Sequence, residues 1–398
     1  MNLKEIPVKL NSLVIFRSLA HGEVMTALSA YVRTLGKGNV EESVKAYSDF
    51  IETLYMHDFD LSKYLLDSAV ADENQYVLLR STGREIPYIV KECVANELDV
   101  LSQISKITAD ELIKASGYDG FLPQFYNSEF NFSAEYARRI LDVHKNGYGI
   151  YARNIMFSVK GGEIIPVKSA DETKIEMLYG YENERKQVID NTRALVEGLP
   201  AANILLCGDA GTGKSSTVKA VTNMFACEGV RLIEFRKDQL RDLPAVMEQL
   251  RTNPLKFILF IDDLSFNKND DNFSALKAIL EGSASVCAGN TVIYATSNRR
   301  HLIKETFADR DSDDVHRRDT MQELLSLSDR FGMTILFQTP DKKLYLDIVH
   351  TLADAKKITL DRAELDTRAE AFALKKGSRS ARAAEQFTDL ILTEQNLK

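Results

Sequence analysis

The chain has 398 residues, of which 44% are hydrophobic and 27% are charged, so it is long enough to form two or three domains with buried cores. Its formal net charge of −8 disfavours indiscriminate binding to nucleic acid. No window approaches the ~18 apolar residues of a membrane span, and the first residues lack the pattern of a signal peptide. We therefore expect a cytoplasmic protein without a transmembrane segment.

Cysteine usage agrees with that expectation. The four cysteines form no CxxC pair and no cluster with histidine, so the sequence predicts neither a disulfide framework nor a zinc site. A reducing compartment fits this pattern best. The cysteines are Cys93, Cys207, Cys227 and Cys287.

Residues 1–153 are predicted to form a mainly helical N-terminal domain. Apolar residues recur at helical spacing in the stretch 87–101, for example Val90 and Val94. The stretch 121–151 combines many aromatic residues with basic ones, which indicates either packing within a helical domain or a surface that stacks nucleobases. The residues concerned are Phe125, Tyr126, Phe130, Phe132, Tyr136, Tyr148 and Tyr151, with Arg138, Arg139 and Lys145.

The pattern of apolar residues changes after residue 153. Residues 154–170 alternate around Gly161 and Gly162, which predicts a β-hairpin connector. Between 171 and 339, short apolar runs are separated by helical stretches, which predicts an α/β core with a parallel five-stranded sheet. The predicted strands are 203–208, 231–235, 256–262, 291–297 and 333–339.

The C-terminal part, residues 340–398, contains no further strand pattern. Three helical stretches follow Pro340, and Gly377 stands where the second of them is expected to end. We expect these helices to form a helical lid on the α/β core.

The segment GDAGTGKSS has the G-x4-G-K-S spacing of a phosphate-binding loop, between a predicted strand and a predicted helix. The glycines let backbone N–H groups surround phosphate oxygens, and the helix presents its positive end. Lys214 is predicted to reach the β- and γ-phosphates, and Ser215 to bind Mg²⁺. The predicted nucleotide-binding residues here are Gly208, Asp209, Ala210, Gly211, Thr212, Gly213, Lys214, Ser215 and Ser216.

An acidic pair, Asp262 and Asp263, follows a strongly apolar run. Asp262 is predicted to hold a Mg²⁺-bound water, and Asp263 to orient or activate the attacking water. Helix capping places the same residue types at strand ends, but a phosphate loop upstream favours the catalytic interpretation.

Four further polar residues complete the predicted site. Asn298 follows the next buried run and is predicted to bond the γ-phosphate or the water. Arg330, just before the last strand, is predicted to neutralise charge on a γ-phosphate, including one bound by a neighbouring subunit. Arg379 and Arg382 share roughly one helix face, and one of them is predicted to reach the phosphates. Turn residues and solvated arginines are the alternatives.

Taken in chain order, these residues resemble the motifs of the AAA+ superfamily of ATPases. Gly208–Ser215 resembles its Walker A motif and the Asp262-Asp263 pair its Walker B motif. In the same order, Asn298, Arg330 and Arg379 resemble sensor 1, the arginine finger and sensor 2. The phrases YGYENERKQVIDNT and SLSDRFG look most like a bacterial family of predicted AAA+ ATPases that is known only as a domain of unknown function.

This resemblance implies a P-loop AAA+ core that binds ATP and Mg²⁺ and hydrolyses ATP, within a homo-oligomer where Arg330 acts in trans. It also implies that Leu178, Gly180 and Tyr181 lie near the adenine. One residue departs from the common pattern, because Asp263 stands where many AAA+ proteins have glutamate. The shorter carboxylate predicts slow turnover.

Three functions stay open at this point. The first is an ATP-dependent remodeller or regulator of a protein client that the N-terminal domain selects. The second is a helicase-loader-like, nucleic-acid-associated ATPase, and the third is a switch that hydrolyses ATP slowly. The densely charged loop 299–329 is predicted either to be solvated or to form ion pairs between subunits. The pairs would join Arg299, Arg300, Arg317 and Arg318 to Asp309, Asp311, Asp313 and Asp314.

Overall fold

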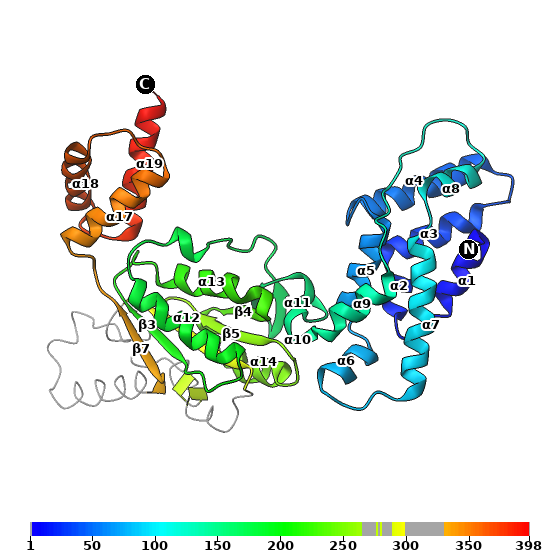
Figure 1. The fold of residues 1–398 in the computed structure, drawn as a ribbon, viewed down its shortest axis with the longest axis horizontal. Helices are drawn as coiled ribbons and strands as arrows, with labels where there is room; N and C mark the ends of the chain where they lie inside the picture. The colour runs from blue at the N-terminus through cyan, green and yellow to red at the C-terminus, as the bar shows by residue number, and fades with distance from the viewer. Residues whose placement is uncertain (1, 265–275, 278, 281–288, 299–329, 398) are drawn as a thin grey trace. The chain divides into compact units, whose positions relative to one another are not determined.

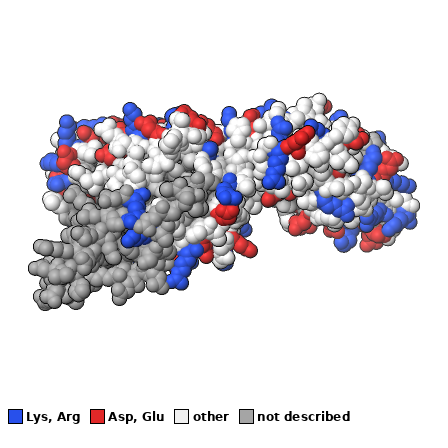
Figure 2. Space-filling model, turned by 90° about the horizontal axis from the view of Figure 1, so that it is seen from below, with Lys and Arg blue, Asp and Glu red and all other residues white. Residues whose placement is uncertain are grey.

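The computed structural model describes residues 2–264, 276–277, 279–280, 289–298 and 330–397. The chain divides into two compact units, Met1–Arg153 and Asn154–Lys398 (Figure 1). Among the described helices, none has the length and apolar character needed to cross a membrane. On the face shown in Figure 2, acidic and basic side chains are interspersed over both units.

The first unit is built from helices, as the sequence predicts. Its elements are η1 (Leu3–Glu5), α1 (Ile6–Asn11), α2 (Arg17–His21), α3 (Glu23–Thr34), α4 (Val40–Tyr55), α5 (Leu61–Ala71), α6 (Gln75–Ser81), α7 (Tyr88–Ser105), α8 (Ala109–Ser116), α9 (Phe132–Leu141), α10 (Val143–Asn146) and α11 (Ile150–Arg153). Helix α4 shows why they form. Asn39 caps its first turn by accepting from the Glu42 amide, and Tyr47, Phe50 and Leu54 bury one face at helical spacing.

The aromatic residues of the stretch 121–151 mostly pack inside this unit. Tyr136 meets Phe16 edge to face at a ring-centroid distance of 5.4 Å. Each such buried ring contributes about 1.5–3 kcal/mol of hydrophobic stabilisation. Packing is therefore what most of these residues do, while Tyr126 is 75% exposed and Phe130 is half-buried. The buried members are Phe125, Phe132, Tyr136, Tyr148 and Tyr151.

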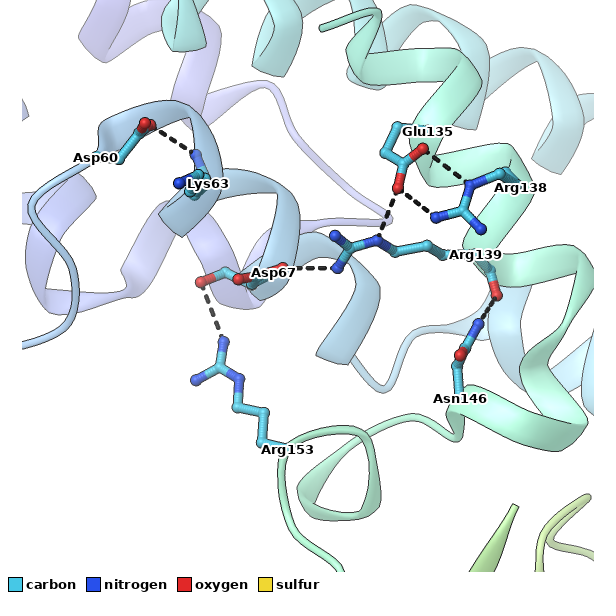
Figure 3. Close-up of polar contacts among 9 residues, drawn as sticks. Asp60, Lys63, Asp67, Glu135, Arg138, Arg139, Asn146 and Arg153 are labelled. Carbon is cyan, nitrogen blue, oxygen red and sulfur yellow. Dashed lines mark hydrogen bonds and ion pairs between the residues drawn. The ribbon is translucent and has the colours of Figure 1, made fainter. Parts of the chain in front are cut away.

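The two arginines of that stretch are held by carboxylates of the same unit (Figure 3). Arg138 forms a two-pronged contact with Glu135, at 2.6 and 2.9 Å, and lowers the pKa of that carboxyl to about 2. Arg139 bonds Glu135 at 3.1 Å and Asp67 at 2.7 Å. Their guanidinium groups are thus already paired within the unit.

A seven-stranded sheet forms the centre of the second unit, in the order β2-β1-β4-β5-β6-β3-β7. All neighbouring strands are parallel except β2, which runs antiparallel to β1. The strands are β1 (Met156–Lys160), β2 (Glu163–Pro166), β3 (Ile204–Gly208), β4 (Val230–Phe235), β5 (Lys256–Ile261), β6 (Thr291–Ser297) and β7 (Met333–Phe337). The five predicted strands correspond to β3–β7.

The prediction of a five-stranded sheet is wrong, because the hairpin 154–170 belongs to the same sheet. Its turn residues Gly161 and Gly162 have φ of 61° and 81°, which suits a tight hairpin turn. Strand β1 also pairs in parallel with β4, and Phe157 lies opposite Ile233. The backbone groups along β4 thereby gain hydrogen-bond partners that a free hairpin would leave unpaired.

Helices α12 (Glu182–Val196) and α13 (Lys214–Phe225) pack on one face of this sheet. Val188 and Val221 meet strand residues such as Leu206 there. The hydroxyl of buried Tyr294 bonds Thr192 Oγ1 at 2.8 Å, and burial raises the pKa of that tyrosine. Among the described residues, the further elements of this unit before β7 are η2 (Ile175–Met177), η3 (Ala226–Glu228), η4 (Lys237–Asp242) and α14 (Leu243–Leu250).

Three C-terminal helices, α17 (Lys342–Ala355), α18 (Arg362–Lys376) and α19 (Ala381–Asn396), follow β7 and share a small core. Gly377 ends α18 with φ of 72°, as predicted. Tyr345 of α17 is fully buried in this core, and its hydroxyl donates to the Ala369 carbonyl of α18. We call α17–α19 the C-terminal helices.

Candidate nucleotide-binding site

The glycine-rich loop begins where β3 reaches the carboxyl edge of the sheet. Gly208 has φ of 139°, and a Cβ there would lie 1.9 Å from the Phe337 carbonyl oxygen of β7. Gly211 and Gly213 also have positive φ, 80° and 89°, and Gly213 precedes the first turn of α13. The backbone path therefore requires glycine, and it places the helix N-terminus, with its free amide groups, at the end of the loop.

Lys214 lies inside the loop rather than in solvent, with 5% of its surface exposed. Its ammonium donates to the carbonyls of Gly208 at 2.9 Å and Asp209 at 2.7 Å, and to Asn298 Oδ1 at 3.2 Å. Burial lowers the pKa of this lysine. A buried ammonium with several exchangeable partners is suited to bind phosphate oxygens.

Asp262 is the acceptor at the centre of the site. Its Oδ1 accepts from Ser215 Oγ at 2.6 Å, from Thr296 Oγ1 at 2.5 Å and from the Asp263 amide at 3.1 Å. Sequence analysis found Ser215 and Asp262 but not Thr296. Its position, two residues before Asn298 at the end of a buried strand, was the available signal.

Asp263 and Asn298 are also brought together. The Asn298 amide donates to Asp263 Oδ1 at 2.7 Å, while its own Oδ1 accepts from Lys214. Asp263 has φ of 51°, an uncommon backbone state for a residue other than glycine. Its amide donates to Thr296 Oγ1 at 2.9 Å, which holds this conformation. Asn298 thus connects the loop lysine to the second carboxylate.

These groups line one cavity of about 530 Å³ within the second unit. The loop and α13 contribute Ala210, Gly211, Thr212, Gly213, Lys214, Ser215, Ser216 and Thr217, and the strand ends contribute Asp262, Asp263, Thr296 and Asn298. The remaining lining residues are Thr173, Met177, Leu178, Tyr179, Arg185, Ile348, Leu352, Ala381, Arg382 and Glu385. One end of the cavity is therefore polar, and Met177, Leu178, Ile348 and Leu352 make another part apolar.

Two residues of the predicted phosphate loop, Gly208 and Asp209, do not line the cavity. Gly208 does not line the cavity, and its role is the close approach to β7. The Asp209 carboxylate accepts a hydrogen bond from the Thr339 hydroxyl, in the segment that joins β7 to α17. Asp209 thus ties the loop to that connection.

The residues expected near the adenine lie in different surroundings. Leu178 lines the cavity, whereas Tyr181 is buried against Phe337, with ring centroids 5.2 Å apart. The Tyr181 hydroxyl donates to the Gln338 carbonyl at 2.6 Å, and burial raises its pKa. Gly180 lies under Ile348 of α17. The aromatic residue that lines the cavity is Tyr179, which sequence analysis missed.

The two arginines near the start of α19 are separated by the structure. Arg379 forms a two-pronged ion pair with Glu370 of α18, at 2.9 and 3.1 Å, and does not line the cavity. Arg382 does line it, and its amide donates to the Gly211 carbonyl at 3.2 Å. Its side chain makes no hydrogen bond or ion pair with any described residue.

Arg330 lies at the opposite edge of the sheet. Strands β3 and β7 are parallel, with Ile204 opposite Met333 and Gly208 opposite Phe337, and Arg330 precedes the amino end of β7. With a rise of ~3.3 Å per residue, the strand alone separates it from the phosphate loop by roughly 15 Å. The structure therefore does not bring Arg330 to the cavity of its own chain. The charged loop 299–329 lies outside the described residues.

The residues present fit a magnesium nucleotide. Ser215 Oγ and Asp262 Oδ1, 2.6 Å apart, are the hard oxygen ligands that Mg²⁺ prefers. Lys214 and the first amides of α13 face the same cavity, whose volume lies within the usual range of about 300–1,000 Å³ for small-molecule sites. The apolar part is suited to a flat base.

Comparisons with known proteins give a family and a set of distant structural neighbours. A family model described as "Protein of unknown function (DUF815)" matches residues 152–395, more than half of the chain. No curated protein matches the sequence.

The structural neighbours include a RuvB mutant of Thermotoga maritima, at a TM-score of 0.37 and 15% identity, over 55% of this chain. This chain covers 63% of that one, so it spans less than two thirds of its length. The RuvB Holliday junction branch migration motor of the same organism is matched at a TM-score of 0.34 and 14% identity, over 57% of this chain and 73% of that one.

Proposed function

Because the chain belongs to the DUF815 family of proteins of unknown function, its activity has to be inferred from its site, and we propose that it is an AAA+ protein that binds and hydrolyses ATP to remodel or regulate a macromolecular partner. The observation that carries this proposal is the hydrogen-bonded set of Lys214, Asn298 and Asp263 beside Ser215 and Asp262. These five groups come from the first turn of α13 and from the ends of two parallel strands, β5 and β6, and they converge on a single cavity.

In this proposal the loop amides and Lys214 bind the β- and γ-phosphates. Ser215 and Asp262 would hold Mg²⁺, which when bound neutralises charge on the phosphate oxygens. Thr296 keeps the Asp262 carboxylate aimed at Ser215. Phosphate oxygens would replace the Gly208 and Asp209 carbonyls as acceptors for the lysine.

Asp263 is proposed to orient the attacking water and accept its proton. The Asn298 amide donates to its carboxylate and so sets the direction of that carboxylate, while the Asn298 oxygen accepts from Lys214. A change in the partners of Lys214 would therefore alter the position of Asn298 and, through it, that of the Asp263 carboxylate. The short carboxylate, already engaged by an amide, also favours a second candidate function, a switch that hydrolyses ATP slowly.

We further propose that the protein works as a homo-oligomer. Arg330 is too far from its own loop to touch the phosphates, which supports action in trans on a neighbouring subunit's nucleotide. Within one chain, Arg382 is better placed than Arg379 for contact with the phosphates, since it lines the cavity and lacks a partner among the described residues.

The N-terminal unit is proposed to bind a protein client in the cytoplasm. A shallow hollow there is lined by Ile51, Tyr55, Met56 and Pro123 together with Ser48 and Glu52, and Met56 is 72% exposed. Phe59, whose ring lies 4.9 Å from that of Tyr55, extends the apolar surface. Exposed apolar groups of this kind are typical of protein interfaces. The nucleic-acid alternative is weakened, because most aromatic rings of 121–151 are buried.

The test compares the wild type with Asp263→Asn. We expect Mg²⁺-dependent ATP hydrolysis by the wild type and a loss of at least about a hundredfold in the variant, with ATP affinity changed less than about threefold. Unchanged turnover in Asp263→Asn would refute the role of Asp263. Tight ATP binding without measurable turnover in the wild type would select the switch instead.

A further inference from the structure

Arg185 is a buried cation at the cavity that neither the motifs nor the family match accounts for. It lies in the first turn of α12, lines the cavity and is 7% exposed. Its guanidinium bonds one described side chain, the Glu182 carboxylate at 3.3 Å. That carboxylate lies on the same helix and is 75% exposed.

This group has donors left for a further partner. Arginine carries five N–H donors and no acceptor, and the contact with Glu182 uses only part of that capacity. Burial lowers the pKa of Arg185, as expected for a cation removed from water without a buried partner. A ligand in the cavity that offers hydrogen-bond acceptors would supply what the chain does not.

The neighbours of Arg185 link it to the apolar part of the cavity. One helical turn before it, Tyr181 is anchored to the Gln338 carbonyl after β7. Gly180, the residue before that, contacts Ile348 of α17, which belongs to the apolar part of the cavity. Lys214 and Ser215, in contrast, lie at the polar end with Asp262. The start of α12 therefore adjoins the part of the cavity suited to a nucleoside.

We propose that Arg185 is a specificity-determining residue that donates hydrogen bonds to acceptor atoms of the nucleoside, the base or the ribose, and not to the phosphates. The inference rests on the proposed nucleotide-binding function. It adds a nucleoside contact that the phosphate-loop motif does not contain.

The test measures dissociation constants of the full chain for ATP, ADP, 2′-deoxy-ATP and inorganic tripolyphosphate, which has no nucleoside. In Arg185→Gln, affinity for ATP and ADP should fall equally, by about 10- to 100-fold, as for lost bonds to a charged donor. Affinity for tripolyphosphate should stay unchanged. Arg185→Lys should recover part of the loss. A smaller loss with 2′-deoxy-ATP than with ATP would assign the contact to the 2′-hydroxyl, and an equal loss would assign it to the base or to another ribose oxygen.

The matched control is Arg193→Gln, an exposed arginine on the same helix that does not line the cavity and should bind every ligand as the wild type does. Wild-type ATP affinity in Arg185→Gln would overturn the inference. Equal losses for ATP and tripolyphosphate would also overturn it, because they indicate a phosphate contact or a damaged fold. If the wild type binds neither ligand, the proposed function fails as well, which is a different result.

Discussion

Arginines in two regions of the molecule differ in what they bind. In the helical unit, Arg138 meets Glu135 at 2.6 Å and Arg139 meets Asp67 at 2.7 Å (Figure 3). At the cavity, Arg382 has no partner among the described residues, and Arg185 has only one exposed carboxylate. The sequence alone does not distinguish the arginines of the helical unit from those at the cavity. The difference teaches that the hydrogen-bonding state of an arginine, more than its presence beside aromatic residues, indicates a ligand site.

The largest expected effect concerns Arg330, which does not line the cavity described above. Arg330→Ala should lower ATP turnover by about 10³-fold or more, as for an arginine finger, and leave ATP affinity nearly unchanged. Steady-state kinetics and equilibrium binding would measure the two effects. Mixing this variant with Asp263→Asn should restore part of the turnover, because each subunit supplies what the other lacks. An equal loss of affinity and turnover would make Arg330 structural.

The next largest effect is expected from Lys214→Ala. This change removes the buried cation at the polar end, so ATP and tripolyphosphate affinity should both fall by about a hundredfold. Lys219→Ala on the same helix is the control, since Lys219 pairs with Asp171 and does not line the cavity. Titration calorimetry would report both ligands. Retained tripolyphosphate binding in Lys214→Ala would show that the loop does not hold phosphate.

Arg382→Ala and Arg379→Ala compare a cavity arginine with a paired arginine near the start of the same helix, α19. Loss of the cavity residue Arg382 should lower ATP affinity or turnover by about tenfold, the size of one charge-assisted contact. Arg379→Ala should leave nucleotide kinetics unchanged and change the free energy of unfolding little, because its pair with Glu370 is partly exposed. The reverse outcome, with only Arg379 affecting kinetics, would assign the phosphate contact to Arg379 instead.

A smaller effect is expected from Thr296→Val, which keeps the shape of the side chain and removes its hydroxyl. Asp262 then loses one donor, and the Asp263 amide loses one acceptor. We expect a several-fold loss of turnover and about 1 kcal/mol of stability, measured by kinetics and urea unfolding. Thr222→Val, a buried threonine of α13 outside the cavity lining, should lose stability only. Unchanged turnover in Thr296→Val would remove Thr296 from the site.

The last prediction is that an added ligand, single-stranded DNA, has no effect on turnover. Single-stranded DNA should not stimulate ATP hydrolysis, because Arg138 and Arg139 are paired within the unit and most nearby rings are buried. The measurement is turnover with and without DNA over a range of salt concentrations. Salt-sensitive stimulation that disappears in Arg138→Gln would contradict this and support the loader-like alternative.

Much of this site follows from the sequence alone. The phosphate loop, the acidic pair and Asn298 each stand at the end of an apolar run, and parallel strands bring their carboxyl ends to one edge of a sheet. Those residues therefore meet whatever the details of packing. The family match also confirms that the motifs belong to a family without an assigned function. Local chain geometry is enough for these conclusions.

Only the tertiary structure decided the rest. The hairpin 154–170 joins the sheet because β1 finds backbone partners on β4, which no local pattern encodes. Arg379 and Arg382 look equivalent in the sequence, but Glu370 of another helix pairs with the first and leaves the second at the cavity. Arg185 is likewise one of many helical arginines until its burial and its single partner are known. Contacts between distant segments settle these questions, because hydrogen-bond partners and exclusion from water are properties of the folded chain.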